Sequence, residues 1–326
     1  MKKTISTITA ALAFAGIATS AQALTELKMY TFGSATNLPI WIAQDLGLFE
    51  KNGLKVVRET TKGSKMQMKA LMDGKYQIVS TAFDNIVAYT EGTGAAKYDN
   101  YDVVAIGGVH SGMNSVVTSP EVKKWSDLKG KTASVDALTS GYATVLYKIL
   151  KGKGLERDKD YKVITVGSTG ARVKSLKEKT SQIAIISSPA DLRLKREGFH
   201  ILADASQELG AYQGSVYATR KSWAKGHRKE LVAFMKAIME AQEMIHTNKA
   251  KAMEVLKAHV KGMTNEDMAE MFKDMTAPGG FSRKAALNKK GMQTVLDLRS
   301  IYGGQKFPAG YAKYIDTSYA DAAMKK

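Results

Sequence analysis

Short strand-like segments alternate with helix-like segments from about residue 26 to about residue 220, and this alternation constrains the fold more than any other feature of the sequence. Each strand-like segment is rich in Val, Ile, Ala or Tyr and is bounded by Gly, Asp, Asn or Ser. Strands that alternate with helices predict parallel α/β sheets with helices on both faces. The predicted strands are residues 26–30, 55–58, 77–80, 103–106, 115–118, 131–135, 162–166, 183–186 and 215–219.

After about residue 222 the pattern changes to helices almost without interruption, up to residue 302. Leu231, Phe234 and Ile238 follow the period of a helix with one buried face. Thr264 and Asp267 have the spacing of a capping box at the start of a later helix. The methionines that share these helices predict core packing rather than a binding groove.

The first 23 residues have the three parts of a secretory signal peptide. Lys2 and Lys3 form a positive start, and residues 8–18 form an apolar run that is too short to span a bilayer. Ala21 and Ala23 then supply the small residues of an Ala-x-Ala cleavage site. We therefore expect export to the periplasm and cleavage after Ala23.

The chain contains no cysteine and carries a formal net charge of +17. Without cysteine there are no disulfides, cysteine nucleophiles, thiolate zinc sites or iron–sulfur clusters, and no lipid-modified cysteine after the leader. We therefore expect no stable membrane anchoring. The positive charges are scattered, their densest groups being pairs such as Lys289-Lys290, and no nucleic-acid motif accompanies them. This charge predicts a solvated basic surface or a preference for an anionic ligand.

Sequence signatures of common enzymes are not found. The chain has no GxSxG elbow, no HExxH, no Walker loop and no GxGxxG after a strand, and its five histidines include no close pair. We therefore expect no catalytic residue, no metal and no cofactor. His110, in a glycine-rich link between two predicted strands, is either a hydrogen-bonded loop residue or the base that an enzyme would need.

Several predicted strands end in a small or polar cluster that opens a helix. Helix N-termini offer unpaired N–H groups and partial positive charge, and in an open α/β sheet they meet at the edge where ligands bind. Each cluster is also explained by helix capping alone, as at Asn37. The strongest candidate is residues 138–146 (LTSGYATVL), where Gly141 permits close approach, Thr139 and Ser140 bring hydroxyls, and Tyr142 can stack.

Arg172 is predicted in the first turn of a helix that follows Ser168 and Thr169. An arginine at that end opposes the helix dipole, so helix electrostatics alone do not explain it. Two interpretations remain open from the sequence. Arg172 either faces solvent or pairs with a carboxylate or sulfonate through two parallel hydrogen bonds.

Four motifs occur in order along the chain. They are Asn37-Leu-Pro-Ile-Trp-Ile-Ala with Asp45-Leu-Gly-Leu-Phe-Glu-Lys-Asn-Gly-Leu-Lys-Val, then Ser126-Asp-Leu-Lys-Gly-Lys-Thr, Thr139-Ser-Gly-Tyr-Ala and Ser187-Ser-Pro-Ala-Asp-Leu. Together they resemble the substrate-binding proteins of ABC transporters in the sulfonate/taurine/nitrate and thiamine-precursor superfamily. The resemblance covers essentially the whole chain.

The resemblance implies a type II periplasmic binding protein fold, in which two α/β lobes joined by two hinge crossings close over a ligand cleft. The implied divisions are a signal peptide at 1–23, the first part of lobe 1 at 24–111, lobe 2 at 112–213 and the second part of lobe 1 at 214–326. The crossings are expected near residues 107–112 and 208–215. The C-terminal helices are expected to buttress lobe 1.

Ligand contacts are also implied by position. Most of them come from the loops that the resemblance identifies, and His110 is added from the link between the lobes. The predicted ligand-binding residues are Asn37, Leu38, Trp41, Thr81, Phe83, Asn85, His110, Thr139, Ser140, Gly141, Tyr142, Ser168, Thr169, Arg172, Ser187 and Ser188.

The implied function is that of a monomeric periplasmic carrier. It delivers a small organic anion, a sulfonate or carboxylate that includes aromatic acids, to an inner-membrane ABC permease and its ATPase, without binding nucleic acid. One alternative is a neutral or cationic heterocycle such as a pyrimidine thiamine precursor, which Asp84, Asp136 or Asp191 in the cleft would favour. Another is a secreted enzyme on the same fold. The cytosolic pyrimidine synthase branch of the superfamily relies on cysteines, and this chain has none.

Overall fold

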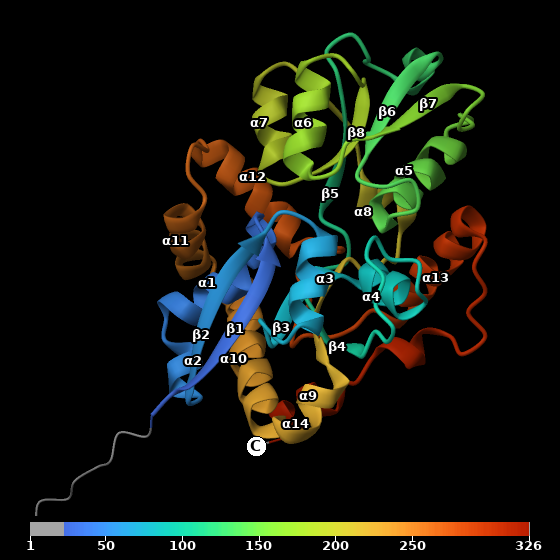
Figure 1. The fold of residues 1–326 in the computed structure, drawn as a ribbon. Coiled ribbons are helices and arrows are strands. Elements are labelled where there is room, and N and C mark those ends of the chain that lie inside the picture. Colours follow the sequence, from blue (N-terminus) through green and yellow to red (C-terminus); the bar gives the residue numbers. More distant parts are fainter. Residues whose placement is uncertain (1–22, 326) are drawn as a thin grey trace, which may run out of the picture.

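The computed structural model describes residues 23–325 and contains two five-stranded sheets flanked by helices (Figure 1). The predicted signal peptide lies outside the described residues except for Ala23. The first sheet has the order β2-β1-β3-β10-β4, with β1 parallel to β2 and β3, and with β10 antiparallel to β3 and β4. Its strands are β1 (Thr25–Phe32), β2 (Leu54–Thr61), β3 (Ile78–Ala82), β4 (Val103–Gly108) and β10 (Ser215–Arg220).

The second sheet repeats this arrangement in the order β7-β6-β8-β5-β9. β6 is parallel to β7 and β8, and β5 is antiparallel to β8 and β9. The predicted α/β fold with two lobes is therefore confirmed, but the sheets are mixed rather than wholly parallel. The strands are β5 (Asn114–Thr118), β6 (Lys131–Val135), β7 (Tyr161–Thr165), β8 (Ile183–Ser187) and β9 (His200–Asp204).

The antiparallel strand of each sheet is explained by the path of the chain between the sheets. β5 and β10 are the strands that follow each passage of the chain from one sheet to the other, and each is inserted between two strands of the sheet it enters. Sequence reasoning missed β9, because its residues are all half-buried and carry no alternation of buried and exposed side chains.

Helices cover both sheets, and the predicted change to helices after residue 222 is confirmed. The helices before β10 are α1 (Leu38–Asp45), α2 (Leu48–Lys51), α3 (Ser64–Met72), α4 (Phe83–Thr90), α5 (Gly141–Gly152), α6 (Thr169–Lys177), α7 (Ala190–Arg196) and α8 (Ala205–Leu209). Those after it are α9 (Lys221–Gly226), α10 (Arg228–Thr247), α11 (Lys249–His259), α12 (Asn265–Thr276), α13 (Lys289–Gly303) and α14 (Ser318–Met324). Short 3₁₀ turns lie at η1 (Ala35–Asn37), η2 (Trp125–Leu128) and η3 (Tyr311–Tyr314).

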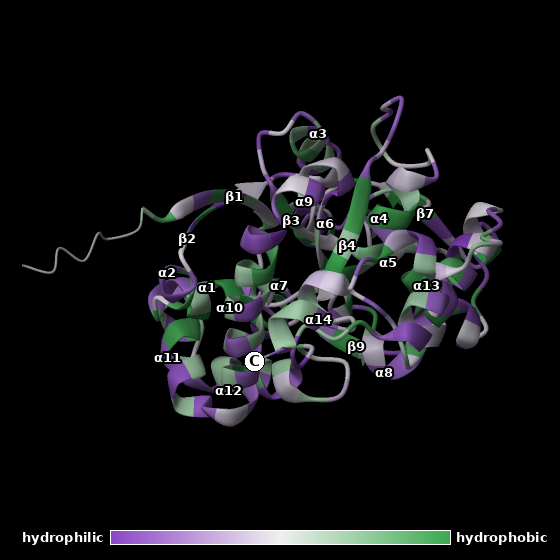
Figure 2. Ribbon diagram, turned by 90° about the horizontal axis from the view of Figure 1, so that it is seen from below, coloured by the Kyte–Doolittle hydropathy of each residue, from purple (hydrophilic) through white to green (hydrophobic). Residues whose placement is uncertain are grey.

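The C-terminal helices complete the core of the first lobe. Leu231, Phe234 and Ile238 of α10 are fully buried in one cluster with residues of α1 and β1, and the capping box of Thr264 and Asp267 opens α12 as predicted. Figure 2 shows β4 as a largely hydrophobic strand and the helices around it with hydrophobic and hydrophilic residues interspersed. Within residues 23–325, no helix combines the length and the apolar character needed to cross a membrane.

Two chain segments, residues 109–113 and 210–214, pass between the sheets side by side. The N–H of Gly214 donates to the carbonyl of His110 at 3.0 Å, and the N–H of Val109 donates to the carbonyl of Ser215 at 2.9 Å. A third segment joins them, because the N–H of Ser282 donates to the carbonyl of Val109 at 2.9 Å. The two crossings of the predicted fold are therefore present, whereas the exact lobe boundaries stay a prediction.

Helix α13 approaches the second crossing so closely that Gly291 has no room for a side chain. A Cβ atom at this position would lie 2.3 Å from the carbonyl carbon of Tyr212 and 2.6 Å from the backbone nitrogen of Gln213. We expect Gly291→Ala to lower the free energy of unfolding by roughly 1–3 kcal/mol, as overpacking does elsewhere. Urea denaturation, monitored by circular dichroism, measures this change.

Gly303 provides a control in the same helix. Its nearest neighbour would be the side-chain oxygen of Gln305, 3.7 Å from the added Cβ, which is ordinary contact. Gly303→Ala should be neutral or stabilising by up to about 1 kcal/mol, since alanine favours helix over glycine. Equal stabilities for the two variants would contradict the close approach of α13 to the crossing.

Candidate functional site

The polar edge of the second sheet brings several predicted residues together. Ser187, at the end of β8, donates its hydroxyl to Oδ1 of Asn114 at 2.8 Å. Burial raises the pKa of Tyr142 in the first turn of α5, and a hydrogen bond with the side chain of Asn114 and the charge of Arg172 oppose this rise. Sequence reasoning missed Asn114. The sequence signal that could have identified Asn114 is an amide side chain at the first position of the strand that follows a crossing.

Arg172 lies inside this edge and is only 3% exposed, so the interpretation as a solvent-facing arginine is wrong. Its Nε donates to the carbonyl of Ile185 at 3.0 Å, its Nη1 to the carbonyl of Gly167 at 2.7 Å, and its Nη2 to the hydroxyl of Thr169 at 3.1 Å. All three acceptors are neutral. A guanidinium has five N–H donors, so two of them are left over.

The charge of Arg172 has no ion-pair partner among residues 23–325. Burial lowers its pKa, and the carboxylate of Asp136 acts in the opposite direction from a longer distance. A buried charge without a paired counter-charge costs several kcal/mol. An anion that reached the two remaining N–H groups would offset this cost.

The N-terminus of α5 was the strongest predicted anion-binding site, but a carboxylate of the other lobe already occupies it. The backbone N–H of Gly141 interacts with the carboxylate of Asp84 in α4. Ser140 caps the helix, accepting from the N–H of Ala143 at 3.1 Å, and donates its hydroxyl to Asp136. A Cβ on Gly141 would lie 2.7 Å from that of Asp84, so only glycine permits this approach.

Asp84 is also ion-paired with Arg299 of α13 at 2.8 Å, and both side chains are almost completely buried. Burial raises the pKa of Asp84, and the charge of Arg299 opposes the rise. Arg299 further donates to the carbonyl of Thr139 at 3.4 Å. Asp84 and Arg299 therefore touch the second lobe from the first.

The loop between β8 and α7 forms another contact between the lobes. The carbonyl of Ser188 accepts from the N–H of Ala35 in the first lobe at 3.4 Å. The hydroxyl of Ser188 donates to Asp191 at 2.7 Å, and that of Ser115 donates to the same carboxylate at 2.6 Å. Burial raises the pKa of Asp191. The carboxylate and both hydroxyls are thus used within the second lobe.

The predicted residues of the first lobe are more deeply placed. Asn37 precedes α1 as expected, but its side chain does not cap the helix and instead donates to the carbonyls of Phe32 at 2.7 Å and Ser34 at 3.0 Å. Leu38 is fully buried. The ring of Trp41 stacks on His259 of α11, with ring centres 4.7 Å apart, and is 7% exposed.

The remaining predicted residues shape loops. Asn85 donates to the hydroxyl of buried Thr81 at 2.9 Å, and Phe83 packs its fully buried ring against Tyr314. Ser168 caps α6 by accepting from the N–H of Ala171 at 3.3 Å. The structure thus gathers Tyr142, Arg172 and Ser187 at one edge and leaves Leu38, Trp41 and Phe83 in the hydrophobic core.

His110 lies in the first crossing and is 1% exposed. Its Nδ1 accepts from the N–H of Gly112 at 3.1 Å, and burial lowers the pKa of His110 to about 4. The imidazole is therefore neutral at pH 7 and serves as a hydrogen-bonded residue of the link. Beside it, Asn114, Tyr142 and Tyr212 line a narrow cavity of about 10 Å³, room for a single water molecule.

Comparison with known proteins gives the fold a context. The chain is 23% identical over 217 residues to YtlA of Bacillus subtilis (strain 168), a match that spans 65% of this chain and 64% of YtlA, less than two thirds of that protein. The periplasmic nitrate-binding protein NrtA of Synechocystis PCC 6803 superposes with a TM-score of 0.74 at 15% identity, over 93% of this chain and 89% of that one.

The periplasmic aliphatic sulphonate binding protein SsuA of Escherichia coli has a TM-score of 0.68 at 16% identity, over 92% of this chain and all of that one. These likenesses show the periplasmic binding protein fold that the sequence motifs implied. Residues 20–260 match the family model described as the NMT1-like family, which is well over half of the chain. The chain therefore belongs to the NMT1-like family.

Proposed function

We propose that this protein is the solute-binding component of an ABC importer and that it binds a small organic anion, a sulfonate or carboxylate, between its two lobes. The family and the fold support the binding role, and solved relatives of this fold are named for sulfonate and for nitrate. The observation that carries the anionic ligand is Arg172, a buried cation whose three acceptors are all neutral.

We propose that the ligand lies at the polar edge of the second sheet. The two remaining N–H groups of Arg172 would hold its acidic group, and Tyr142, Asn114 and Ser187 would contact its body. The cavity beside Tyr142 is too small for such a ligand, so entry requires the lobes to separate. We propose that the other predicted residues shape the loops of the two lobes, apart from Leu38, Trp41 and Phe83, which lie in the hydrophobic core.

We further propose a division of the chain at the two crossings. Lobe 1 comprises residues 24–111 and 214–326, and lobe 2 comprises residues 112–213. The pairing of residues 109–113 with 210–214 supports a hinge there, since both links between the sheets run through these segments. Binding then proceeds by rotation of one lobe toward the other.

The proposed location is the periplasm, with cleavage after Ala23, and the proposed partners are an inner-membrane ABC permease and its ATPase. The signal-peptide pattern of the first 23 residues supports export, and the solved relatives named above are periplasmic. The protein is proposed to act as a freely diffusing monomer.

The alternative of a neutral or cationic heterocycle depended on a free carboxylate in the cleft. Asp84 is occupied by Arg299 and Gly141, Asp191 accepts two serine hydroxyls, and Asp136 accepts the hydroxyl of Ser140. Of these three carboxylates, only Asp84 has an ion-pair partner within residues 23–325, whereas Asp191 and Asp136, like Arg172, have neutral hydrogen-bond partners. We favour the anion because Arg172 keeps two unused N–H donors, and the thermal-shift screen decides between the two ligand classes.

The alternative of an enzyme depended on His110 as a base. Its imidazole is buried in the crossing, and Nδ1 already accepts a backbone hydrogen bond from Gly112. The proposal accordingly contains no chemical step, and turnover of a bound compound by the purified protein would contradict it.

A thermal-shift screen tests the ligand class. Aliphatic and aromatic sulfonates and carboxylates are compared with neutral and cationic heterocycles, because a ligand present at 100 times its dissociation constant adds about 2.7 kcal/mol to stability. We expect stabilisation by one or more acids. Stabilisation by a cationic or neutral heterocycle alone would contradict the anionic ligand.

Replacement of Arg172 tests the site itself. Arg172→Gln removes the charge and keeps a donor for the neighbouring carbonyls, so we expect at least tenfold weaker binding of the acid found in the screen, a loss of about 1.4 kcal/mol. Isothermal titration calorimetry measures the affinity. The ligand-free variant loses an unpaired buried charge but also hydrogen bonds to the carbonyls of Ile185 and Gly167, so its melting temperature is measured alongside to show that it is folded.

Lys174→Gln is the matched control, since it removes one positive charge from the exposed face of the same helix. Its affinity should equal that of the parent. Unchanged affinity of the Arg172→Gln variant, with Lys174→Gln also unchanged, would remove Arg172 from the ligand site.

A further inference from the structure

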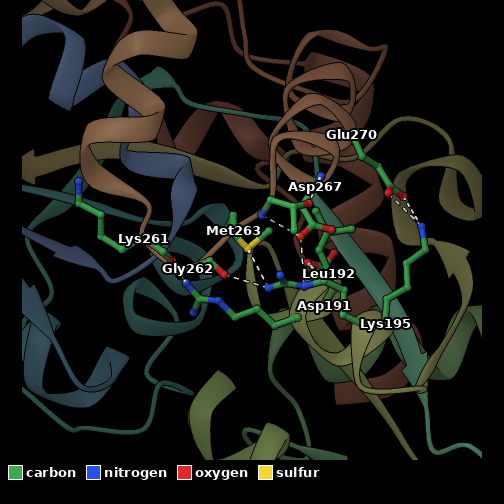
Figure 3. Close-up of polar contacts among 11 residues, drawn as sticks. Asp191, Leu192, Lys195, Lys261, Gly262, Met263, Asp267 and Glu270 are labelled. Carbon is green, nitrogen blue, oxygen red and sulfur yellow. Dashed lines mark hydrogen bonds and ion pairs between the residues drawn. The ribbon is translucent and has the colours of Figure 1, made fainter.

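Helix α7 of the second lobe extends basic side chains across to the first lobe, as Figure 3 shows. Nη2 of Arg193 donates to the carbonyl of Lys261 at 2.7 Å, and Nη2 of Arg196 donates to the carbonyl of Gly262 at 2.9 Å. Both carbonyls lie just after the end of α11. Each bond joins two residues that are more than sixty positions apart in the sequence, one in each lobe.

Two ion pairs accompany these bonds. Nε of Arg196 lies 3.1 Å from the carboxylate of Asp267, and Nζ of Lys195 lies 2.7 Å from that of Glu270. Asp267 and Glu270 lie about one turn apart on α12 (Figure 3). The side chains of three basic residues of α7 therefore contact two carbonyls and two carboxylates of the segment 261–270.

The acceptors suit positive charge for physical reasons. The carbonyls of Lys261 and Gly262 accept from charged guanidinium groups, and such hydrogen bonds are stronger than those between neutral groups. Asp267 is held in place before Arg196 reaches it, because its carboxylate accepts from the N–H of Thr264 at 3.2 Å in the capping box. Its side chain is only 10% exposed, so this pair is less screened than a surface pair.

We infer that Arg193, Lys195 and Arg196 form a clasp that holds the two lobes closed in the absence of ligand. The inference rests on the proposed hinge between the lobes, but not on the proposed ligand. None of the three residues belongs to the polar edge around Arg172. The clasp therefore stabilises the closed state by contacts that a ligand does not touch.

This separation has a consequence for affinity. A ligand that needs the closed state binds more tightly when that state is already populated, by the factor by which its population has risen. The clasp accordingly raises the affinity for every ligand by the same factor. Because the pair of Lys195 and Glu270 is half-exposed, part of this gain is screened by salt.

The experiment measures the lobes without any ligand. The chain has no cysteine, so Lys65→Cys in α3 and Lys174→Cys in α6 introduce a single labelled pair, one exposed position in each lobe. Pulsed electron paramagnetic resonance then gives the distribution of distances between the two spin labels. In the Lys195→Ala/Arg196→Ala variant we expect the ratio of closed to open molecules to fall about tenfold, or about 1.4 kcal/mol.

Lys177→Ala is the matched control. It breaks the pair of Lys177 with Glu197, 2.6 Å apart, which lies wholly within the second lobe. This variant should keep the distance distribution of the parent. Raising the salt from about 0.1 M to about 1 M, where the Debye length shrinks to about 3 Å, should open the parent but scarcely change the double variant.

Charge reversal tests the contact directly and guards against a general loss of structure. Glu270→Lys faces Lys195 with a like charge and should open the lobes, and the further change Lys195→Glu should close them again. A double-alanine variant with the parent's distances, a parent that is fully open, or a reversed pair that stays open would each overturn the clasp. Failure of the Arg172 experiment would leave this result unaffected, since no ligand is present.

Discussion

The pairing of the two crossings is the constraint on which the positions of all other site residues depend. Gln213 holds it together, because its fully buried side chain donates to the carbonyls of His110 at 3.3 Å and Ser215 at 3.1 Å and accepts from the N–H of Asn288 at 2.8 Å. One side chain thus connects both crossings and the start of α13. Since an unsatisfied buried amide costs about 1–3 kcal/mol, this connection resists partial breakage.

The arrangement of charges around the cleft follows from these fixed positions. α13 begins at the crossing, and its far end brings Arg299 to Asp84, which in turn reaches the N-terminus of α5. The protein's own carboxylate therefore fills the helix terminus where a ligand's acid was expected. Arg172 is a buried cation without an ion-pair partner among residues 23–325, and this shifts the proposed anion-binding site from the N-terminus of α5 to the first turn of α6.

Much of the fold could be predicted because its signals are local. The cap of α5 at Ser140 lies three residues before the N–H it binds, and the strands carry their own composition. The pairing of Asp84 with Arg299 could not be predicted, since the two lie 215 residues apart. The burial of Arg172 was equally hidden, because its acceptors include the carbonyl of Ile185, and a backbone group leaves no trace in the sequence.

The two proposals divide the binding energy between two places. A contact inside the cleft, such as that of Arg172, changes the affinity for one ligand relative to another, because it depends on the charge of the ligand. A contact outside the cleft changes only the balance between open and closed states, which every ligand shares. Selectivity and overall affinity can then vary independently. The basic residues at the end of α7 can change without altering which ligand is bound.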